Sequence, residues 1–323
     1  MSVPTAKEET HYHWREPEEV EAVASHLAAL GYQIDRIGTL DALLERWRSN
    51  QLPDFVWNLS VRSLSRNRTA LAPAILEQLS VPYTGGDATA KSLTLNKDLL
   101  KPVLQWCGIL TPSWFRYTRS EEIESLPPWP VSILKPACEG YSLGLRRFDT
   151  SEGLMALRQV VDELHDSFQA PVLCEEFIAG REITVGIVGN GSPVLMGAVE
   201  TVDGTGESLN EQVLDLKAKR QGVFKKVSVD LSCTPLQELL EGRTHSRPPL
   251  WELMSLLGSL DYATFDFRIA EDGQAYLLDV NADATLHPER SLAQVARAAG
   301  FSYGELIEAI LKTSLERWQK NFG

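Results

Sequence analysis

The sequence has no long apolar segment and few cysteines, and both absences limit what the protein can be. No apolar run approaches the ~20 residues that a membrane-spanning helix needs, and the polar start MSVPTAKEETHYHW lacks the apolar core of a secretory signal. The four cysteines have neither the paired spacing of a zinc site nor that of a disulfide framework; they are Cys107, Cys138, Cys174 and Cys233. We therefore expect a cytoplasmic protein with reduced thiols and no membrane partner.

Positive charge is also scarce. The chain carries 31 basic against 44 acidic residues, a net charge of −13 at pH 7, and such a balance repels the phosphate backbone of nucleic acids. The six histidines show no metal-ligand spacing, and no serine–histidine–aspartate arrangement is evident. We therefore expect no nucleic-acid partner and no nucleophilic side chain, although a nucleotide partner is not excluded.

What the chain does contain is alternating helical and strand-like patterns, over a length of 323 residues that suits two or three domains. Apolar spacing between Pro17 and Gly31 predicts a helix over 17–30. Further helices are predicted at 71–79, 95–105 and 155–168, strands at 32–37, 55–59, 131–134 and 172–178, and a hairpin at 182–199 that turns at Asn190-Gly191. The early alternation favours a parallel α/β unit whose first strand is missing.

A second predicted hairpin joins the runs on either side of Asp272-Gly273, read as a two-residue turn. If Glu271 faces Gln274, then Asp266 lies opposite Asp279. The same register pairs Thr264 with Asn281. One face of the hairpin then carries Asp266, Arg268, Leu277, Asp279 and Asn281. The other is predicted to be core, with Phe265, Phe267, Ile269, Tyr276, Leu278 and Val280.

Two carboxylates placed directly opposite each other destabilise a sheet unless something compensates their charge. Asp266, Asp279 and the amide oxygen of Asn281 are ligands that suit Mg²⁺, which takes oxygen donors and often shares its coordination with substrate phosphates. The structural alternative is a solvated face neutralised by Arg268.

Other candidate side chains follow one another along the chain. Lys97 lies on a predicted helix, and Lys135 ends a strand before the small-residue loop ACEGYSLG (137–144), whose backbone N–H groups could approach a phosphate. Acids follow at Glu175-Glu176 and at Glu182, before the lysine Lys219. Taken singly, each is more often a surface lysine or a solvated strand edge.

The order of these elements resembles the D-alanine:D-alanine ligase branch of the ATP-grasp superfamily, over nearly the whole chain from about Pro17 onward. The resemblance rests on NRTALAPAILEQLSVPYTGGDATAKSLTLNKDLLKPVL, SILKPACEGYSLG, VLCEEFIAGREITVGIVG, LDYATFDFRIAEDGQAYLLDVN and SLAQVARAAGFSYGELIEAIL. It implies an open parallel α/β N-terminal domain (1–86), a central lobe (87–178) and a C-terminal lobe (179–323), with ATP sandwiched between two antiparallel sheets. It also implies a homodimer.

The resemblance further implies ATP and Mg²⁺ as cofactors, a small-molecule carboxylate and an amine as substrates, and a role for each matched residue. ATP would be bound by Lys97, Lys135, Glu139, Tyr141, Ser142, Glu175, Glu176, Phe177, Ile178, Glu182 and Lys219. The metal ligands would be Asp266, Asp279 and Asn281, and Lys219 would be the catalytic lysine. Arg268 and Arg290 are candidate catalytic cations of a different kind, because they could substitute for the family arginine that is missing at Thr264. Substrate contacts would come from Tyr141, Arg220, Ser291 and Leu292.

The sequence departs from the family pattern mainly on the substrate side. Thr264 stands where the ligases carry an arginine, and a hydroxyl cannot replace a planar cation. Asp279 replaces a glutamate, Ala284-Thr285 a Pro-Gly pair, Tyr141 a serine and Arg220 a tyrosine. Two functions therefore remain open: a carboxylate–amine ligase with a substrate other than D-alanine, or an ATP-binding relative with weak or no ligase activity.

Overall fold

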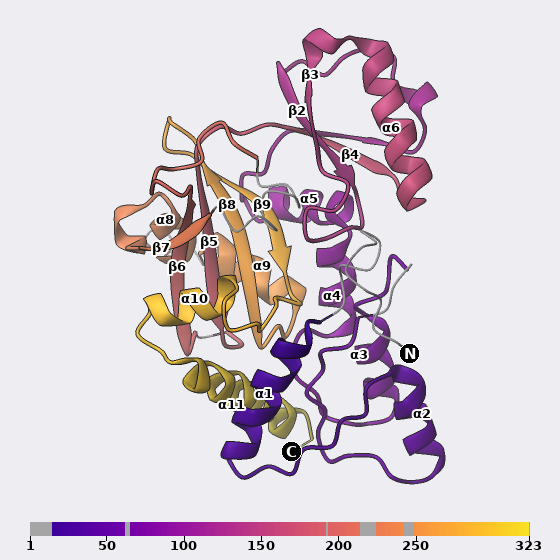
Figure 1. The fold of residues 1–323 in the computed structure, drawn as a ribbon, viewed down its shortest axis with the longest axis vertical. Coiled ribbons are helices and arrows are strands. Elements are labelled where there is room, and N and C mark those ends of the chain that lie inside the picture. The colour runs from indigo at the N-terminus through magenta and orange to yellow at the C-terminus, as the bar shows by residue number, and fades with distance from the viewer. Residues whose placement is uncertain (1–14, 62–64, 192, 214–223, 242–247, 323) are drawn as a thin grey trace.

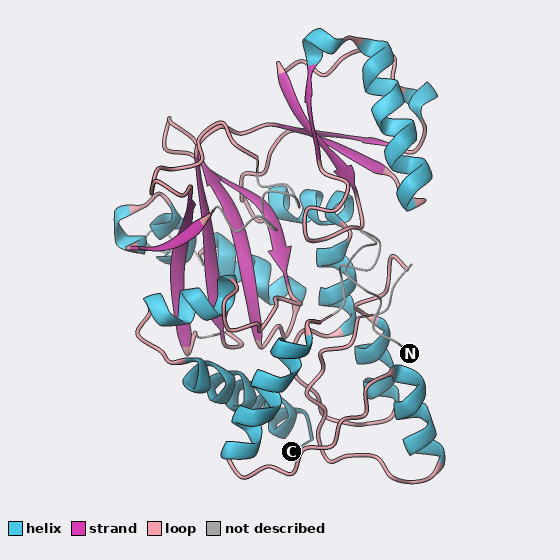
Figure 2. Ribbon diagram, viewed as in Figure 1, coloured by secondary structure: helices cyan, strands magenta, loops and turns pink. Residues whose placement is uncertain are grey.

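Two antiparallel sheets organise the computed structural model, which describes residues 15–61, 65–191, 193–213, 224–241 and 248–322 (Figures 1 and 2). The smaller sheet, in the order β1-β4-β2-β3, contains β1 (Trp114–Tyr117), β2 (Val131–Pro136), β3 (Arg146–Asp149) and β4 (Val172–Glu176). The larger, in the order β7-β6-β5-β8-β9, contains β5 (Arg181–Val188), β6 (Leu195–Val202), β7 (Lys225–Val229), β8 (Tyr262–Ile269) and β9 (Ala275–Asn281). The two antiparallel sheets expected for ATP-grasp lobes, and the hairpin β5–β6, are thus confirmed.

The helices are α1 (Pro17–Ala29), α2 (Leu40–Arg48), α3 (Leu71–Gln78), α4 (Ala88–Leu95), α5 (Lys97–Trp106), α6 (Leu154–Phe168), α8 (Leu236–Glu241), α9 (Pro249–Leu257), α10 (Ser291–Ala298) and α11 (Tyr303–Phe322). They cover parts of these sheets, with α6 on the smaller sheet and α10 on the larger, while α2 and α3 lie away from both (Figure 1). The helix predicted at 95–105 starts only at Lys97, because Asn96 leaves helical geometry (ψ 84°) and separates α4 from α5. None of the helices within the described segments is both long and apolar enough to span a bilayer.

The strands predicted for the N-terminal part are mostly wrong. Residues 32–37 form no strand, and Tyr32 and Ile34 are 50% and 37% exposed. Within 55–59, only Val56 makes a bridge, which is parallel, to Tyr83. Backbone N–H and C=O groups need partners, and the described residues supply no strand beside 32–37, so this apolar run remains a loop open to water.

The first helix packs against the last. Val23 and Leu27 of α1 are buried in one cluster with Leu306 and Ile310 of α11, and Figure 1 shows these two helices crossing at the base of the larger sheet. This contact brings the residues around the start of α1 next to the segment that follows β9.

The hairpin β8–β9 has the predicted pairing at its acidic end and a different one near its turn. Asp266 lies opposite Asp279, but Phe267 pairs with Leu277 and Ile269 with Ala275. The turn is one residue longer than predicted, with Gly273 at φ +83°, as in three-residue loops. An extra residue on β9, Leu278, restores the register.

This bulge corrects the predicted faces of β9. Leu277 is fully buried in the core rather than lying on the acidic face. Leu278 lines the cleft described below, and Tyr276 is only half-buried. The register of the acids was therefore right because two departures from the ideal hairpin cancel.

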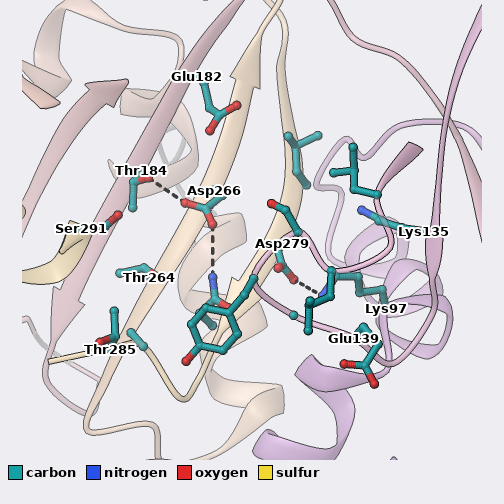
Figure 3. Close-up of a pocket in the computed structure, with 18 of the residues that line it drawn as sticks. Lys97, Lys135, Glu139, Glu182, Thr184, Thr264, Asp266, Asp279, Thr285 and Ser291 are labelled. Carbon is teal, nitrogen blue, oxygen red and sulfur yellow. Dashed lines mark hydrogen bonds and ion pairs between the residues drawn. The ribbon is translucent and has the colours of Figure 1, made fainter. Parts of the chain in front are cut away.

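Strand β5 alternates between the core and the cleft, as the two-residue period of a strand requires. Ile183, Val185 and Ile187 are buried among residues of α9. Gly186 faces the other way, and a Cβ atom there would lie only 2.8 Å from Val295 Cγ1 of α10. The absent side chain lets α10 pack tightly against the sheet and directs the start of α10, Ser291, toward the cleft (Figure 3).

Candidate active site

A cleft of about 470 Å³ lies between the two sheets, within the range of about 300–1,000 Å³ that is usual for ligand sites. It brings together every predicted site residue whose structure is described: Lys97, Lys135, Glu139, Tyr141, Ser142, Glu175, Glu176, Phe177, Ile178, Glu182, Asp266, Arg268, Asp279, Asn281, Arg290, Ser291 and Leu292. Thr264 lines it as well. Lys219 and Arg220 lie outside the described residues.

The paired carboxylates of β8 and β9 form one end of this cleft (Figure 3). Thr184 Oγ1 donates to Asp266 Oδ1 at 2.7 Å, and Asn281 Nδ2 donates to Asp266 Oδ2 at 3.2 Å. Lys97 Nζ lies 3.0 Å from Asp279 Oδ1. Burial raises the pKa of Asp266; nearby Lys226 and the Thr184 hydroxyl oppose this rise, and Asp279 adds to it.

These residues fit a divalent cation. Two carboxylates face each other with an amide beside them, which is an oxygen-rich donor set of the type that Mg²⁺ takes. The raised pKa of Asp266 shows that burial outweighs the stabilisation its ionised form receives from neighbouring groups. A bound cation would favour the charged form of both carboxylates.

A second cluster holds the lysine at the end of β2. Glu175 of β4 binds Lys135 Nζ at 2.5 Å and Lys101 Nζ at 2.8 Å. Burial alone would raise the pKa of Glu175, but the two lysines outweigh it and lower this pKa to about 2. The Glu175 side chain thus fixes Lys135 in the cleft. Our sequence reasoning missed Lys101, although it lies one helical turn after Lys97.

The loop at 137–144 is anchored by Arg68, an arginine that the sequence analysis did not single out. Arg68 donates to the Cys138 carbonyl at 2.9 Å and pairs with Glu139 at 3.1 Å, with its own side chain only 3% exposed. Tyr141 and Ser142 have φ of +56° and +61°, a left-handed conformation that costs energy in residues other than glycine and is often found at functional sites. The loop is therefore anchored at its start and strained at its tip.

Arg268 does not neutralise the Asp266/Asp279 pair, contrary to the structural alternative. Its guanidinium binds Glu182 at 3.1 Å. It also donates to the carbonyls of Gly180 (2.8 Å), Asn210 (3.0 Å) and Gln212 (2.6 Å). These contacts make Arg268 a support for Glu182 rather than a free cation.

The far end of the cleft contains the residues predicted to contact substrate. Arg290, the residue just before α10, pairs with Glu16 at 3.2 Å, and His287 lies 3.3 Å from the same carboxylate. Ser291 is the first residue of α10 and lines the cleft. Leu292 belongs mainly to the core, because its side chain is 1% exposed and packs over Gly186.

A network of ion pairs around Asp283 also lines the cleft. The sequence analysis did not identify it. Asp283 pairs with Arg15 at 2.9 Å and with Lys91 at 2.7 Å. Burial would raise its pKa, but these two cations outweigh burial and lower it. Glu19 accepts from the backbone N–H of Leu286 at 2.6 Å. The start of α1 therefore fixes the segment after β9; the only sequence signal was an acid two residues beyond Asn281.

Comparisons with known proteins agree with this arrangement. The family model described as "D-ala D-ala ligase C-terminus" matches residues 95–312. A D-alanine–D-alanine ligase from Maridesulfovibrio salexigens is 31% identical over 253 residues, which cover 77% of each chain. A D-alanine–D-alanine ligase from Bacillus anthracis, solved in complex with ATP, superposes with a TM-score of 0.68 at 19% identity over 95% of both chains.

The fold also resembles that of the VanG D-Ala:D-Ser ligase from Enterococcus faecalis, with a TM-score of 0.62 and 17% identity over 81% of this chain and 73% of that one. The family match covers the cleft from Lys97 to the end of α10. The chain therefore belongs to the D-alanine–D-alanine ligase family of ATP-grasp proteins.

Proposed function

We propose that the protein is an ATP- and Mg²⁺-dependent ligase that joins a carboxylate to an amine through an acyl phosphate. The observation that carries the proposal is the meeting, in one cleft, of the opposed acids Asp266 and Asp279 with Lys97 and Lys135. A cation-binding acid pair beside two lysines is a charge arrangement suited to a nucleotide triphosphate.

In this reaction a carboxylate oxygen of the acid substrate attacks the γ-phosphorus, and ADP leaves. The amine then attacks the acyl carbon, loses a proton, and expels phosphate to give the amide. No protein nucleophile is needed, because such catalysis consists mainly of positioning and charge stabilisation.

Each cluster in the cleft supplies part of that task. Lys97 and Lys135 bind phosphate oxygens, and Glu175 holds Lys135 in place. Asp266, Asp279 and Asn281 hold Mg²⁺, which when bound offsets the negative charge of the phosphates. Backbone N–H groups of the loop at 137–144 cover the phosphates from the side of the smaller sheet.

The adenosine end of the site is proposed at β4 and the start of β5. Glu176, Phe177 and Ile178 border the base, and Glu182 binds the ribose. We assign Arg268 to the support of Glu182, because its four hydrogen bonds hold that carboxylate and the segment at 210–212. This replaces its predicted catalytic role.

The acid and amine substrates are proposed to differ from D-alanine. Tyr141, Thr264 and Thr285 stand at positions where the sequence departs from the family pattern, and all three line the cleft. Arg290 and Ser291, at the start of α10, are the proposed contacts to the second substrate. Lys219 and Arg220 lie outside the described residues, and their roles toward the γ-phosphate and the substrate remain those that the family resemblance implies.

An ATP-binding relative with weak or no ligase activity is the second candidate. It is favoured by one observation: Thr264 supplies a hydroxyl where an arginine is expected, and Arg268 is tied to Glu182. Loss of a donor that stabilises the transition state costs about 10²–10³ in rate.

The two candidates separate in a single assay. Purified protein is incubated with ATP, Mg²⁺ and pooled acids and amines, and phosphate release and new masses are recorded, with Lys97→Met as the control variant. The ligase predicts ADP and a new amide that both depend on Lys97. ATP binding with no ADP in any mixture supports the second candidate.

A homodimer and a cytoplasmic location remain predictions, testable by light scattering and by fractionation.

A further inference from the structure

A row of polar side chains crosses the cleft face of the larger sheet and ends in a lysine that the sequence did not single out. The row runs from Asp266 on β8 through Thr184 on β5 and Thr201 on β6 to Lys226 on β7. All four residues line the cleft. Lys226 thus reaches the site from three strands away from Asp266.

The hydrogen bonds in this row fix the direction of the lysine. Lys226 Nζ donates to Thr201 Oγ1 at 2.7 Å and makes a longer contact of 3.5 Å with Thr184 Oγ1. An ammonium group only donates, so Thr184 receives from Lys226 on one side and gives its single hydroxyl hydrogen to Asp266 on the other. The ammonium is therefore aimed along the sheet toward the acid pair.

The row lies between two landmarks of the proposed nucleotide site. Thr201 pairs across the strands with Glu182, the proposed ribose ligand, and Thr184 pairs with Asp266, the proposed metal ligand. A triphosphate extends from its ribose to its metal, so it has to pass over this part of the sheet. Lys97 and Lys135 approach the same space from α5 and β2.

The charges are arranged consistently with this placement. Each of the opposed acids has its own lysine: Lys97 contacts Asp279, and the charge of Lys226 acts on Asp266. Thr264 brings no charge, and Arg268 is bound to Glu182 and three carbonyls. Lys226 is thus a cation on the larger sheet that points at the phosphate end of the cleft.

We propose that Lys226 is a phosphate-binding residue, which supplies from the larger sheet a third positive charge to the triphosphate beside Lys97 and Lys135. Thr184 and Thr201 hold its ammonium in position before the nucleotide binds. This inference rests on the proposed function, since it assumes that the cleft binds ATP.

The neighbouring lysine provides a matched control. Lys225 lies on the same strand, is exposed, and donates to the Gly204 carbonyl at 3.0 Å instead of facing the cleft. Lys225→Met removes the same charge from the chain, one residue away, without removing a group that lines the site.

The test measures ATP and adenosine binding to the full chain by calorimetry and equilibrium dialysis, with Mg²⁺ and separately with a chelator. Lys226→Met is expected to weaken ATP binding by about 10- to 100-fold, as for loss of a hydrogen bond to a charged group, and to leave adenosine binding unchanged. Lys226→Arg should retain most of the affinity, and Lys225→Met all of it. If the role of Lys226 were merely structural, Lys226→Met would weaken the binding of ATP and of adenosine by the same factor.

The outcomes separate this inference from the proposed function. Wild-type protein that binds ATP, together with Lys226→Met of equal affinity, overturns the role of Lys226 and leaves the proposed function intact. Wild-type protein that binds neither ATP nor adenosine overturns both. If Lys226→Met does not fold, Lys226→Gln compared with Lys226→Arg carries the same test, and equal ATP affinity of those two variants is the contradicting result.

Discussion

Replacing Glu175 by glutamine removes the charge that holds two buried lysines together. Its carboxylate contacts both Lys135 and Lys101, and its side chain is 4% exposed. The pKa of Glu175 is about 2, against an ordinary value of 4.5. Because a tenfold change in acid dissociation corresponds to about 1.4 kcal/mol, ionised Glu175 contributes about 3 kcal/mol to the free energy of unfolding near neutral pH.

The sign of the pH dependence follows from the lowered pKa. The stabilisation is complete above pH 4.5, where the unfolded chain is also ionised, and it is lost as the pH falls from about 4.5 toward 2. We expect Glu175→Gln to lose about 3 kcal/mol at pH 7. The gap to the wild type should shrink by about 1.4 kcal/mol for each pH unit below 4.5.

Urea denaturation at pH 7 and at pH 3.5 measures this difference, with tryptophan fluorescence as the signal. Trp114 is a local reporter, since Lys101 Nζ lies 5.1 Å from the centre of its ring. Glu176→Gln is the control, because the neighbouring Glu176 carboxylate accepts a hydrogen bond from the Ser113 hydroxyl at 2.9 Å, and its loss should change the free energy of unfolding by less than about 0.5 kcal/mol. A loss below about 1 kcal/mol for Glu175→Gln, or one that does not vary with pH, would refute the reasoning.

Two further predictions concern the cations of the cleft. Lys97→Met removes the only lysine in contact with Asp279 in the described structure, and we expect ADP formation to fall about 10²- to 10³-fold with an unchanged fold, measured by phosphate release and circular dichroism; a rate within a factor of two of wild type would contradict its role. Arg268→Met removes the buried guanidinium that pairs with half-buried Glu182 and donates to three carbonyls. We expect the free energy of unfolding to fall by about 3–5 kcal/mol, measured by urea denaturation; wild-type stability would show that Arg268 is not a structural support.

The sequence predicted the fold best where hydrophobic periodicity and a turn signal agreed. The pattern after Pro17 gave α1, and Asn190-Gly191 gave the hairpin β5–β6. The strand prediction failed at 32–37, because an apolar run becomes a strand only when another strand pairs with it. The local sequence does not indicate whether such a pairing strand is present. Neither the longer turn at Gly273 nor the bulge at Leu278 changed the residues that meet at the acidic end.

Site residues that belong to a local motif, such as one hairpin, could be predicted from the sequence. Site residues that reach the cleft from distant segments of the chain were missed. Asp266 and Asp279 follow from the hairpin alone, and Lys101 could have been found from its spacing to Lys97. Lys226 could not, because its direction depends on the order β7-β6-β5-β8 in the sheet. Arg15 reaches the cleft only because α1 packs on α11. Such contacts arise from tertiary packing rather than from local sequence.

The most direct test of the central claim is a crystal structure of the protein with Mn²⁺ and a non-hydrolysable ATP analogue. Mn²⁺ replaces Mg²⁺ at oxygen ligands and can be located by its anomalous scattering. The account predicts a peak bounded by Asp266, Asp279 and Asn281, with the phosphates of the analogue beside Lys97 and Lys135. A nucleotide bound elsewhere, or a metal that none of these three side chains contacts, would contradict it.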